Sequence, residues 1–186
     1  GERHRARVEE VRERRDQAIA LGDGPAVLLH LYPADETCNF DLLPLKQGRF
    51  EPLPPVAHLH WQTRFNHDGL LAYWPDPPPA SQRLQLFRNG GIELVDTYSV
   101  QRVHAPEPVL FPLNLERDIV NFVQHWTESI HHPLGVSHPL VFCFSITGIR
   151  GFELHIDHRR PFLPKPLFDR DTVSFRPVVL DGVQDS

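Results

Sequence analysis

The sequence predicts an α+β fold, in which an antiparallel or mixed β-sheet with hairpins carries its helices on one face. Three observations predict it. Short apolar runs bounded by proline and glycine recur along the chain, an Asn-Gly-Gly turn joins two of them, and one later segment has apolar residues at helical spacing. At 186 residues, the chain suits one domain with a substantial core.

Composition excludes several classes of protein. The chain is 40% hydrophobic and 23% charged with a net charge of -5, which is ordinary for a soluble protein and argues against a disordered chain. The mild acidity disfavours a non-specific nucleic-acid clamp, which needs a basic face. No segment reaches the roughly 18 consecutive apolar residues of a membrane span, and no leader is evident. We therefore expect a cytoplasmic protein without membrane contact.

The first 22 residues predict a linker helix. Residues 3–21 are rich in helix formers, and their acidic residues lie one turn from arginines, which favours a solvated helix. Gly22-Asp23-Gly24-Pro25 ends it. Because the sequence starts at Gly1 without an initiator Met, we expect residues 1–22 to come from a missing upstream domain and residues 23–186 to form a single α+β domain.

The next segments predict strands. The apolar run 26–32 is typical of a buried strand, and the proline-rich residues 33–55 predict a long connection. Residues 56–61 predict a second strand. Residues 64–74 predict a strand that follows a turn at His67-Asp68-Gly69.

A hairpin is the clearest local signal. Segments 82–88 and 92–98 flank Asn89-Gly90-Gly91, whose residues accept positive φ. If Gly90-Gly91 is the turn pair, Arg88 lies opposite Glu93. Either two-residue register places four residues on one face: Leu84, Leu86, Glu93 and Val95.

The last third predicts the main helix and further strands. Asn114 is a candidate N-cap, and apolar residues recur at helical spacing from Leu115 to Ile130. His131-His132 at the helix end suit the C-terminal dipole. We expect strands at 139–146 and 152–157 joined by a glycine turn, and a last edge strand within 173–180.

Twelve histidines raise a metal hypothesis. His58 and His60 lie on one face of a predicted strand, a spacing that can hold zinc or another divalent metal. Further ligands could come from His30, His155 and Asp157. No third ligand is fixed by the pattern, so scattered histidines and no cofactor are the default expectation, and a metal-dependent hydrolase or nuclease is the alternative.

Other catalytic signatures are missing from the sequence. Cys143 lies between Phe142 and Phe144, which predicts a buried thiol, and Ser145 lacks a nucleophile-elbow context. No Gly-rich phosphate-binding motif occurs. We therefore predict no catalytic residues.

Polar residues at predicted strand ends and turns are the candidate binding residues, because loops carry function more often than cores. For each residue taken alone, turn formation and surface ion pairs are the more common explanation. The set is Arg64, His67, Asp68, Arg88, Asn89, Glu93 and Arg150.

Four strings occur in a fixed order: LHLYP at 29–33, RFNHDGLL at 64–71, QLFRNGGIE at 85–93 and GIRGF at 148–152. Together they resemble the C-terminal region of bacterial proteins that begin with an AlbA-like Schlafen domain and are described as DNA-binding or ATP-binding. The resemblance spans residues 3–180. It implies that nucleic acid or nucleotide is bound by the N-terminal module, and it carries no catalytic residue onto this chain.

The sequence thus predicts a non-catalytic accessory, interaction or sensing domain whose partner is the N-terminal Schlafen-like domain of the same protein. The metal-dependent hydrolase is the first alternative. A direct nucleic-acid-binding module is the second, and it requires Arg64, Arg88 and Arg150 on one face. Homo-oligomerisation stays open.

Overall fold

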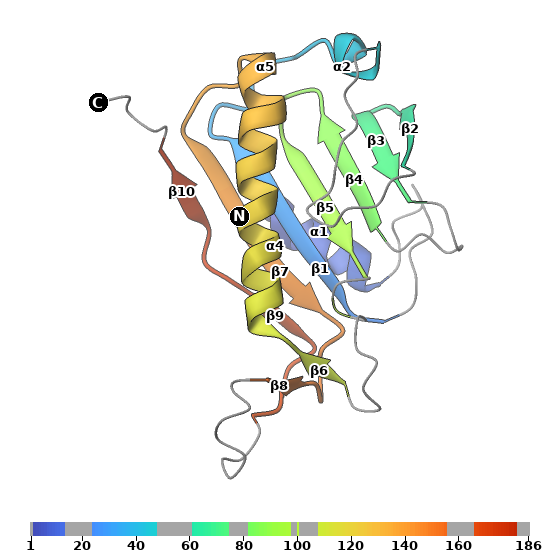
Figure 1. Cartoon of the computed structure of the whole chain (residues 1–186), viewed down its shortest axis with the longest axis vertical. Coiled ribbons are helices and arrows are strands. Elements are labelled where there is room, and N and C mark those ends of the chain that lie inside the picture. Colours follow the sequence, from blue (N-terminus) through green and yellow to red (C-terminus); the bar gives the residue numbers. More distant parts are fainter. Residues whose placement is uncertain are drawn as a thin grey trace.

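A computed structural model describes residues 2–13, 24–47, 61–74, 82–97, 100, 108–155 and 166–181. Within these residues an antiparallel sheet of eight strands has the order β10-β7-β1-β5-β4-β3-β2, with β9 also paired to β7 (Figure 1). Its strands are β1 (Ala26–Pro33), β2 (Gln62–Phe65), β3 (Gly69–Tyr73), β4 (Gln82–Phe87), β5 (Ile92–Asp96), β7 (Leu140–Thr147), β9 (Thr172–Ser174) and β10 (Val178–Leu180). The predicted α+β class is confirmed.

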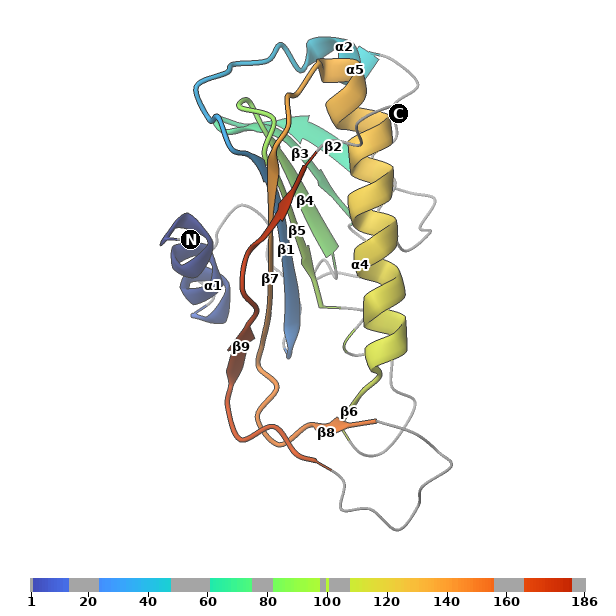
Figure 2. The same cartoon turned by 90° about the vertical axis from the view of Figure 1, so that its left-hand side faces the viewer.

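Helices lie on both faces of this sheet, so the prediction of helices on one face is wrong (Figure 2). One face carries α4 (Pro112–Trp126), which continues through the π-helical turn η1 (Thr127–His131) into α5 (His132–Leu134). The other face carries α1 (Glu2–Arg12). The short α2 (Leu43–Gln47) and a parallel pair, β6 (Val109–Leu110) and β8 (Glu153–Leu154), complete the described elements.

The main core lies between the sheet and α4. Alternate residues of β1, namely Val27, Leu29 and Leu31, face this side and are at most 3% exposed. From α4, Phe122 and Trp126 are fully buried against them. Burying large apolar side chains on both partners is the main source of stability in such a layer.

The opposite face has a much smaller apolar cluster. Among the described residues, this cluster consists of Val8 of α1 with Ala26, Leu28 and Val95 of the sheet, and Val11 is partly buried against them. The prediction of a solvated linker helix is therefore wrong for this side of α1, where His4 and Val8 are buried. Residues 14–21 of the predicted helix lie outside the described residues.

The main helix begins two residues before the predicted N-cap. Pro112 occupies the first turn, and Phe111 is the capping residue without a side-chain cap. Proline suits this position because its φ is already helical and it has no N–H to leave unpaired. Asn114 is thus an exposed helical residue and not a cap. The helix ends at Gly135, whose φ is +70°.

The β4–β5 hairpin has a three-residue loop rather than the predicted two-residue turn. The Phe87 N–H donates to the Gly91 carbonyl at 2.8 Å, and the Gly90 N–H donates to the Phe87 carbonyl at 3.0 Å, with Gly90 at a φ of +84°. Gln85 consequently pairs with Glu93, and Leu86 pairs with Ile92. An odd loop length moves every residue of β5 to the other face, so Leu84 and Leu86 do not share a face with Glu93 and Val95.

A second hairpin joins β2 to β3, where the sequence predicted one strand after the turn. The Asn66 side-chain oxygen accepts hydrogen bonds from the N–H groups of Asp68 and Gly69, which closes the turn. The strand predicted at 56–61 lies outside the described residues except for Trp61.

The predictions after β7 hold in part. An edge segment does pair with β7 within 173–180, but as two short strands, β9 and β10. The strand predicted at 152–157 is short in the described part of the chain. As β8 it pairs with β6, not with β7.

Gly69, the first residue of β3, offers a test of the close approach of β3 to β4. A Cβ built on Gly69, at a φ of +151°, would lie 2.1 Å from the carbonyl oxygen of Leu86. Gly135 also has a positive φ, but nothing lies within 4 Å of its Cβ position. Gly135→Ala should therefore lose only about 1–2 kcal/mol of unfolding free energy through backbone strain. Gly69→Ala should lose about 1–3 kcal/mol more, because the new atom overlaps the backbone.

Urea unfolding of the two variants measures this difference. Equal losses for Gly69→Ala and Gly135→Ala would contradict the described approach of β3 to β4.

Candidate functional site

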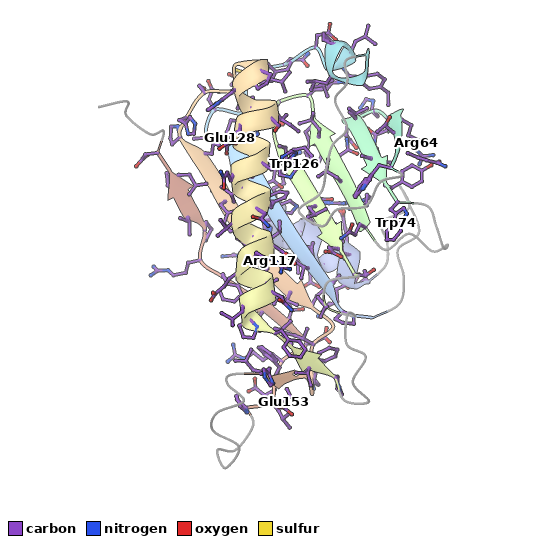
Figure 3. All side chains as sticks on the ribbon, viewed as in Figure 1. Arg64, Trp74, Arg117, Trp126, Glu128 and Glu153 are labelled. Atoms are coloured by element: carbon purple, nitrogen blue, oxygen red, sulfur yellow. The ribbon has the colours of Figure 1, made fainter. Side chains whose placement is uncertain are left out.

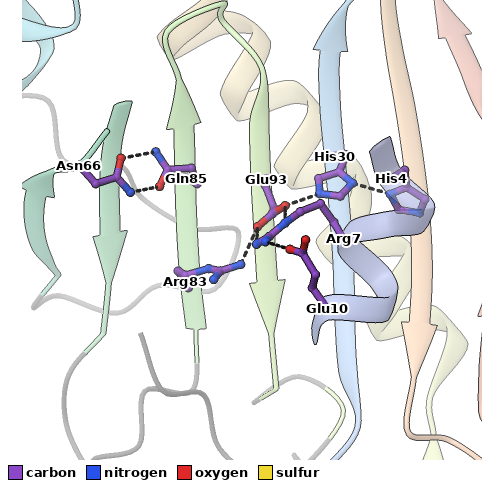
Figure 4. A network of polar contacts seen from close by, with 8 residues as sticks. All are labelled: His4, Arg7, Glu10, His30, Asn66, Arg83, Gln85 and Glu93. Atoms are coloured by element: carbon purple, nitrogen blue, oxygen red, sulfur yellow. Dashed lines mark hydrogen bonds and ion pairs between the residues drawn. The ribbon is translucent and has the colours of Figure 1, made fainter. Parts of the chain in front are cut away.

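A buried carboxylate is the centre of the polar network on the α1 face of the sheet (Figure 4). Glu93, the second residue of β5, is 0% exposed. Arg7 of α1 donates two hydrogen bonds to it, from Nε to Oε2 at 2.8 Å and from Nη2 to Oε1 at 2.7 Å. Arg83 of β4 donates to Oε1 at 2.5 Å, and His30 Nε2 lies 2.7 Å from Oε2. Two guanidinium groups and one imidazole thus converge on a single carboxylate.

Three neighbouring strands and one helix position these groups. His30 is the cross-strand partner of Glu93 on β1, and Gln85 is its partner on β4. Arg83 lies two residues from Gln85 and therefore projects from the same face. Since α1 crosses this face, its residues 4 and 7, one turn apart, reach the sheet together. Arg7 also pairs with Glu10 on its own helix.

A second chain of contacts leads from Glu93 toward the surface. His30 uses its other ring nitrogen, Nδ1, to contact Nδ1 of His4. His4 Nε2 lies 2.7 Å from Ser145 Oγ on β7, and Ser145 lies 2.8 Å from Ser174 Oγ on β9. Ser145 is 0% exposed whereas Ser174 is exposed. The chain Glu93–His30–His4–Ser145–Ser174 therefore links a buried carboxylate to solvent through hydrogen-bonding groups.

Electrostatics keep the centre of the network ionised. Burial on its own would raise the pKa of Glu93, but the hydrogen bonds from His30 and Arg7 outweigh it and hold this pKa well below its usual value. Burial lowers the pKa of Arg83. Burial, together with the charge of His30, lowers the pKa of His4 from 6.5 to about 4. At neutral pH Glu93 is thus a carboxylate held by cationic partners, and His4 is a neutral ring.

Arg3 provides a second anchor for α1. Its guanidinium lies over the ring of Phe87, 4.6 Å from the centroid, and 5.3 Å from the centroid of Tyr32. It also pairs with Glu36 at 3.2 Å. Cation–π contacts of this kind contribute modestly at exposed sites. Together with Arg7 and His4, they make the attachment of α1 to the sheet mainly polar.

A hydroxyl, two imidazoles and a carboxylate in series have the order of groups that activates a nucleophilic serine. Ser145 is the hydroxyl next to the base, and it is completely buried beneath β9 and α1. Since a substrate must contact the nucleophile, this arrangement suits proton sharing and structural attachment better than acyl transfer.

The predicted binding residues do not form one site. His67, Asp68 and Arg88 are exposed in the two adjoining turns, where the Arg88 N–H donates to the Asp68 carbonyl at 3.1 Å. Asn89 accepts a hydrogen bond from the Gly91 N–H and so shapes its own turn. Glu93 is buried in the network.

The two remaining arginines lie elsewhere. Arg64 is on the outer strand β2, over the ring of Tyr73. Arg150 follows β7 at the end where Thr147 pairs with Ala26, whereas Arg88 lies near the end where Leu140 pairs with Pro33. Figure 3 shows Arg64 beside β2 and Glu153, three residues after Arg150, at the far end of the molecule. Arg88 and Arg150 thus lie near opposite ends of β7, and the structure does not bring these three arginines together in one site.

The metal candidates are not brought together in the described part of the chain. His58, His60 and Asp157 lie outside the described residues. His30 has both ring nitrogens engaged, with His4 and Glu93, and His155 packs on Phe111 beside β6 and β8. Among the residues that are described, no group of three His, Cys, Asp or Glu side chains is placed to hold a metal ion.

Sequence reasoning missed His4, Arg7, Arg83 and Ser145. A signal for them exists in the strands: Arg83 and Gln85 alternate with Leu84 and Leu86, and His30 interrupts an apolar run. Such alternation predicts one polar face for the sheet. The arginines of α1 gave no such signal because a charged helix has many solvated arginines.

His131 also differs from its sequence interpretation. It is fully buried, and its Nε2 lies 2.9 Å from the carbonyl oxygen of Gly90 in the β4–β5 loop. Burial lowers its pKa from 6.5 to about 4, so a charged side chain stabilised by the helix dipole is the wrong explanation for this residue. Its ring fastens the end of the helix to the hairpin loop.

We predict that Glu93→Gln loses about 3–5 kcal/mol of unfolding free energy, because it leaves two arginines near a buried site without their anion. Glu10→Gln is the control, since Glu10 pairs with the same Arg7 from a half-exposed position. It should lose less than about 1 kcal/mol. Urea unfolding at neutral pH measures both, and similar losses for the two variants would contradict a central role of Glu93.

No helix within the described residues is long and apolar enough to cross a membrane. Comparisons of the chain with protein-family models, with curated proteins and with solved structures found no match. The Schlafen-associated family therefore stays a prediction from the sequence, and function has to be argued from the geometry of the network.

Proposed function

We propose that this chain is a non-catalytic accessory domain of a Schlafen-type DNA-binding protein, in which it positions or senses the upstream module through α1. The observation that supports the proposal is the pair of hydrogen bonds from the Arg7 guanidinium to the buried carboxylate of Glu93. A helix predicted to be a linker is fixed to the sheet by a bidentate, charge-assisted pair. Anything joined to α1 is thereby oriented relative to the domain.

The kind of interface between α1 and the sheet supports this proposal. Val8 is the buried apolar residue of α1, whereas His4, Arg7 and Arg3 make hydrogen bonds, ion pairs or ring contacts. An interface with so little apolar burial gains little from the hydrophobic effect. Its strength depends on charges and protons, so it can be weakened without unfolding the core beneath α4. That property suits a joint between two modules.

The burial of the network favours a non-catalytic domain over the metal-dependent hydrolase. A hydrolytic site needs an open position for water and substrate. Glu93 and Ser145 are both 0% exposed, and the ring nitrogens of His30 are occupied by protein groups. The hydrolase remains an alternative through His58, His60 and Asp157. Elemental analysis tests it: stoichiometric zinc, iron or manganese in the purified chain would favour a metalloenzyme.

We predict that Arg7→Gln loosens the joint in the two-module protein. Arg7→Gln removes the bidentate pair, whereas the control Arg12→Gln removes exposed ion pairs with Glu9 of α1 and with the adjacent Glu13. The radius of gyration from small-angle X-ray scattering should rise in Arg7→Gln and stay unchanged in Arg12→Gln. DNA affinity should fall with Arg7→Gln if orientation of the module matters for binding.

The proposal fails on either of two results. One is a reading frame that encodes no Schlafen-like module upstream of residue 1. The other is DNA binding by this chain alone with a steep dependence on salt, which would mark a direct nucleic-acid-binding module.

A further inference from the structure

We infer that the His4–His30 pair is a pH-dependent switch, which holds α1 on the sheet and releases it when both rings become charged. The inference goes beyond the proposed function, because it concerns the attachment of α1 whatever module α1 joins. It rests on the contact between the two Nδ1 atoms, which lie within hydrogen-bond distance of each other. The space between them holds one hydrogen.

The possible proton arrangements follow from the partners. The carboxylate of Glu93 only accepts, so His30 Nε2 carries a hydrogen. If both rings are neutral, His4 Nδ1 must donate to the bare Nδ1 of His30 and His4 Nε2 must accept from Ser145, which then cannot donate to Ser174. When the pair holds one added proton, His4 Nε2 donates to Ser145, and Ser145 donates to Ser174 as it does in the structure. One added proton is accommodated, since either ring can be the donor between the two Nδ1 atoms. A second added proton places N–H against N–H, and the contact breaks.

Solvent protons have a route to this pair. Ser145 bridges His4 and Ser174, and each hydroxyl can donate and accept. Ser174 is exposed, so a proton can enter along the hydroxyls without prior opening of the interface. The direction of the His4–Ser145 and Ser145–Ser174 hydrogen bonds depends on the protonation of the pair, because it reverses when His4 gains a hydrogen on Nε2.

The charges around the His4–His30 pair do not stabilise a second added proton on it. The titratable and charged groups that face the pair come from five elements: Arg3, Arg7 and Glu10 of α1, Tyr32 of β1, Arg83 of β4, Glu93 of β5 and Cys143 of β7. Burial raises the pKa of Tyr32 and of Cys143, so both stay neutral in acid. Glu93 stays ionised, but two guanidinium groups and the Nε2–H group of His30 already bind it.

The sign of the pH effect follows from His4. Its pKa is about 4 when α1 is docked and returns toward 6.5 when the ring is released to water. Released α1 therefore binds more protons than docked α1 between these values. Docking is at full strength above pH 6.5 and weakens as the pH falls toward 4, and its equilibrium constant falls about tenfold for each pH unit.

The two cysteines of the chain supply a test without added labels. Cys143 is buried at 2% exposure on the α1 face, as the cross-strand partner of His30, whereas Cys38 is exposed. A disulfide reagent that reacts in acid, 4,4′-dithiodipyridine, counts accessible thiols across the window from about pH 7.5 to about pH 4.5. We expect one reactive thiol at the upper pH and two at the lower. The emission of the three tryptophans, to which the fully buried Trp126 contributes, should remain native throughout, which separates release of α1 from global unfolding.

Two variants make the test specific. His4→Gln keeps a donor and an acceptor but cannot gain a charge, so Cys143 should stay protected at the lower pH. His131→Gln is the matched control, because His131 is an equally buried histidine with a pKa of about 4 on the α4 side. Its Cys143 profile should follow that of the unchanged chain.

Three results would contradict this pH-dependent switch. Cys143 could stay protected down to about pH 4.5 in the unchanged chain, it could react identically in His4→Gln, or it could become reactive only together with a shift in tryptophan emission. If His4→Gln does not fold, proton NMR titration of the His4 ring in the unchanged chain gives the same answer. A His4 pKa near 6.5 in the docked state would refute the inference. None of these results depends on an upstream module, so they leave the proposed function to its own test.

Discussion

The ionised side chain of Glu93 is the constraint on which the second face of this sheet depends. An ionised carboxylate that is fully buried on a sheet is stable only when charged and hydrogen-bonding donors surround it. Arg83 and His30 come from the neighbouring strands, and Arg7 comes from a helix that is distant in sequence. The position of α1 is therefore dictated by charge balance, not by a matching apolar stripe.

The two layers of the molecule differ in their physical basis. Beneath α4, large side chains such as Phe122 and Trp126 exclude water from the sheet, and such contacts change little with pH. Beneath α1, the contacts are ion pairs and shared protons, which respond to pH and to single substitutions. The domain thus combines an apolar layer that is insensitive to pH with a polar layer that responds to it.

The sequence predicted the α+β class, the main helix, the β4–β5 hairpin and the turn at His67-Asp68-Gly69, because apolar periodicity and glycine-rich turns are local signals. It failed at the β4–β5 register, where Asn89-Gly90-Gly91 suits both a two-residue and a three-residue loop. That single ambiguity hid the site, since it placed Glu93 on the face of Leu84 and Leu86. The role of α1 could not be predicted either: whether Arg7 pairs with solvent or with a carboxylate 86 positions away is a tertiary property.

The parity of the β4–β5 loop has a consequence for related chains. Removing one residue between Phe87 and Ile92 would rotate β5 by half a turn and bring Glu93 beneath α4, where apolar side chains surround it. Relatives that keep an acidic residue at this place in β5 should therefore keep the loop at its present length, even where the loop residues themselves vary. Conversely, a relative with a shortened loop should have an apolar residue at the position of Glu93 and no arginine at the position of Arg7. Loop length and helix charge should change together, although the two segments are not adjacent in sequence.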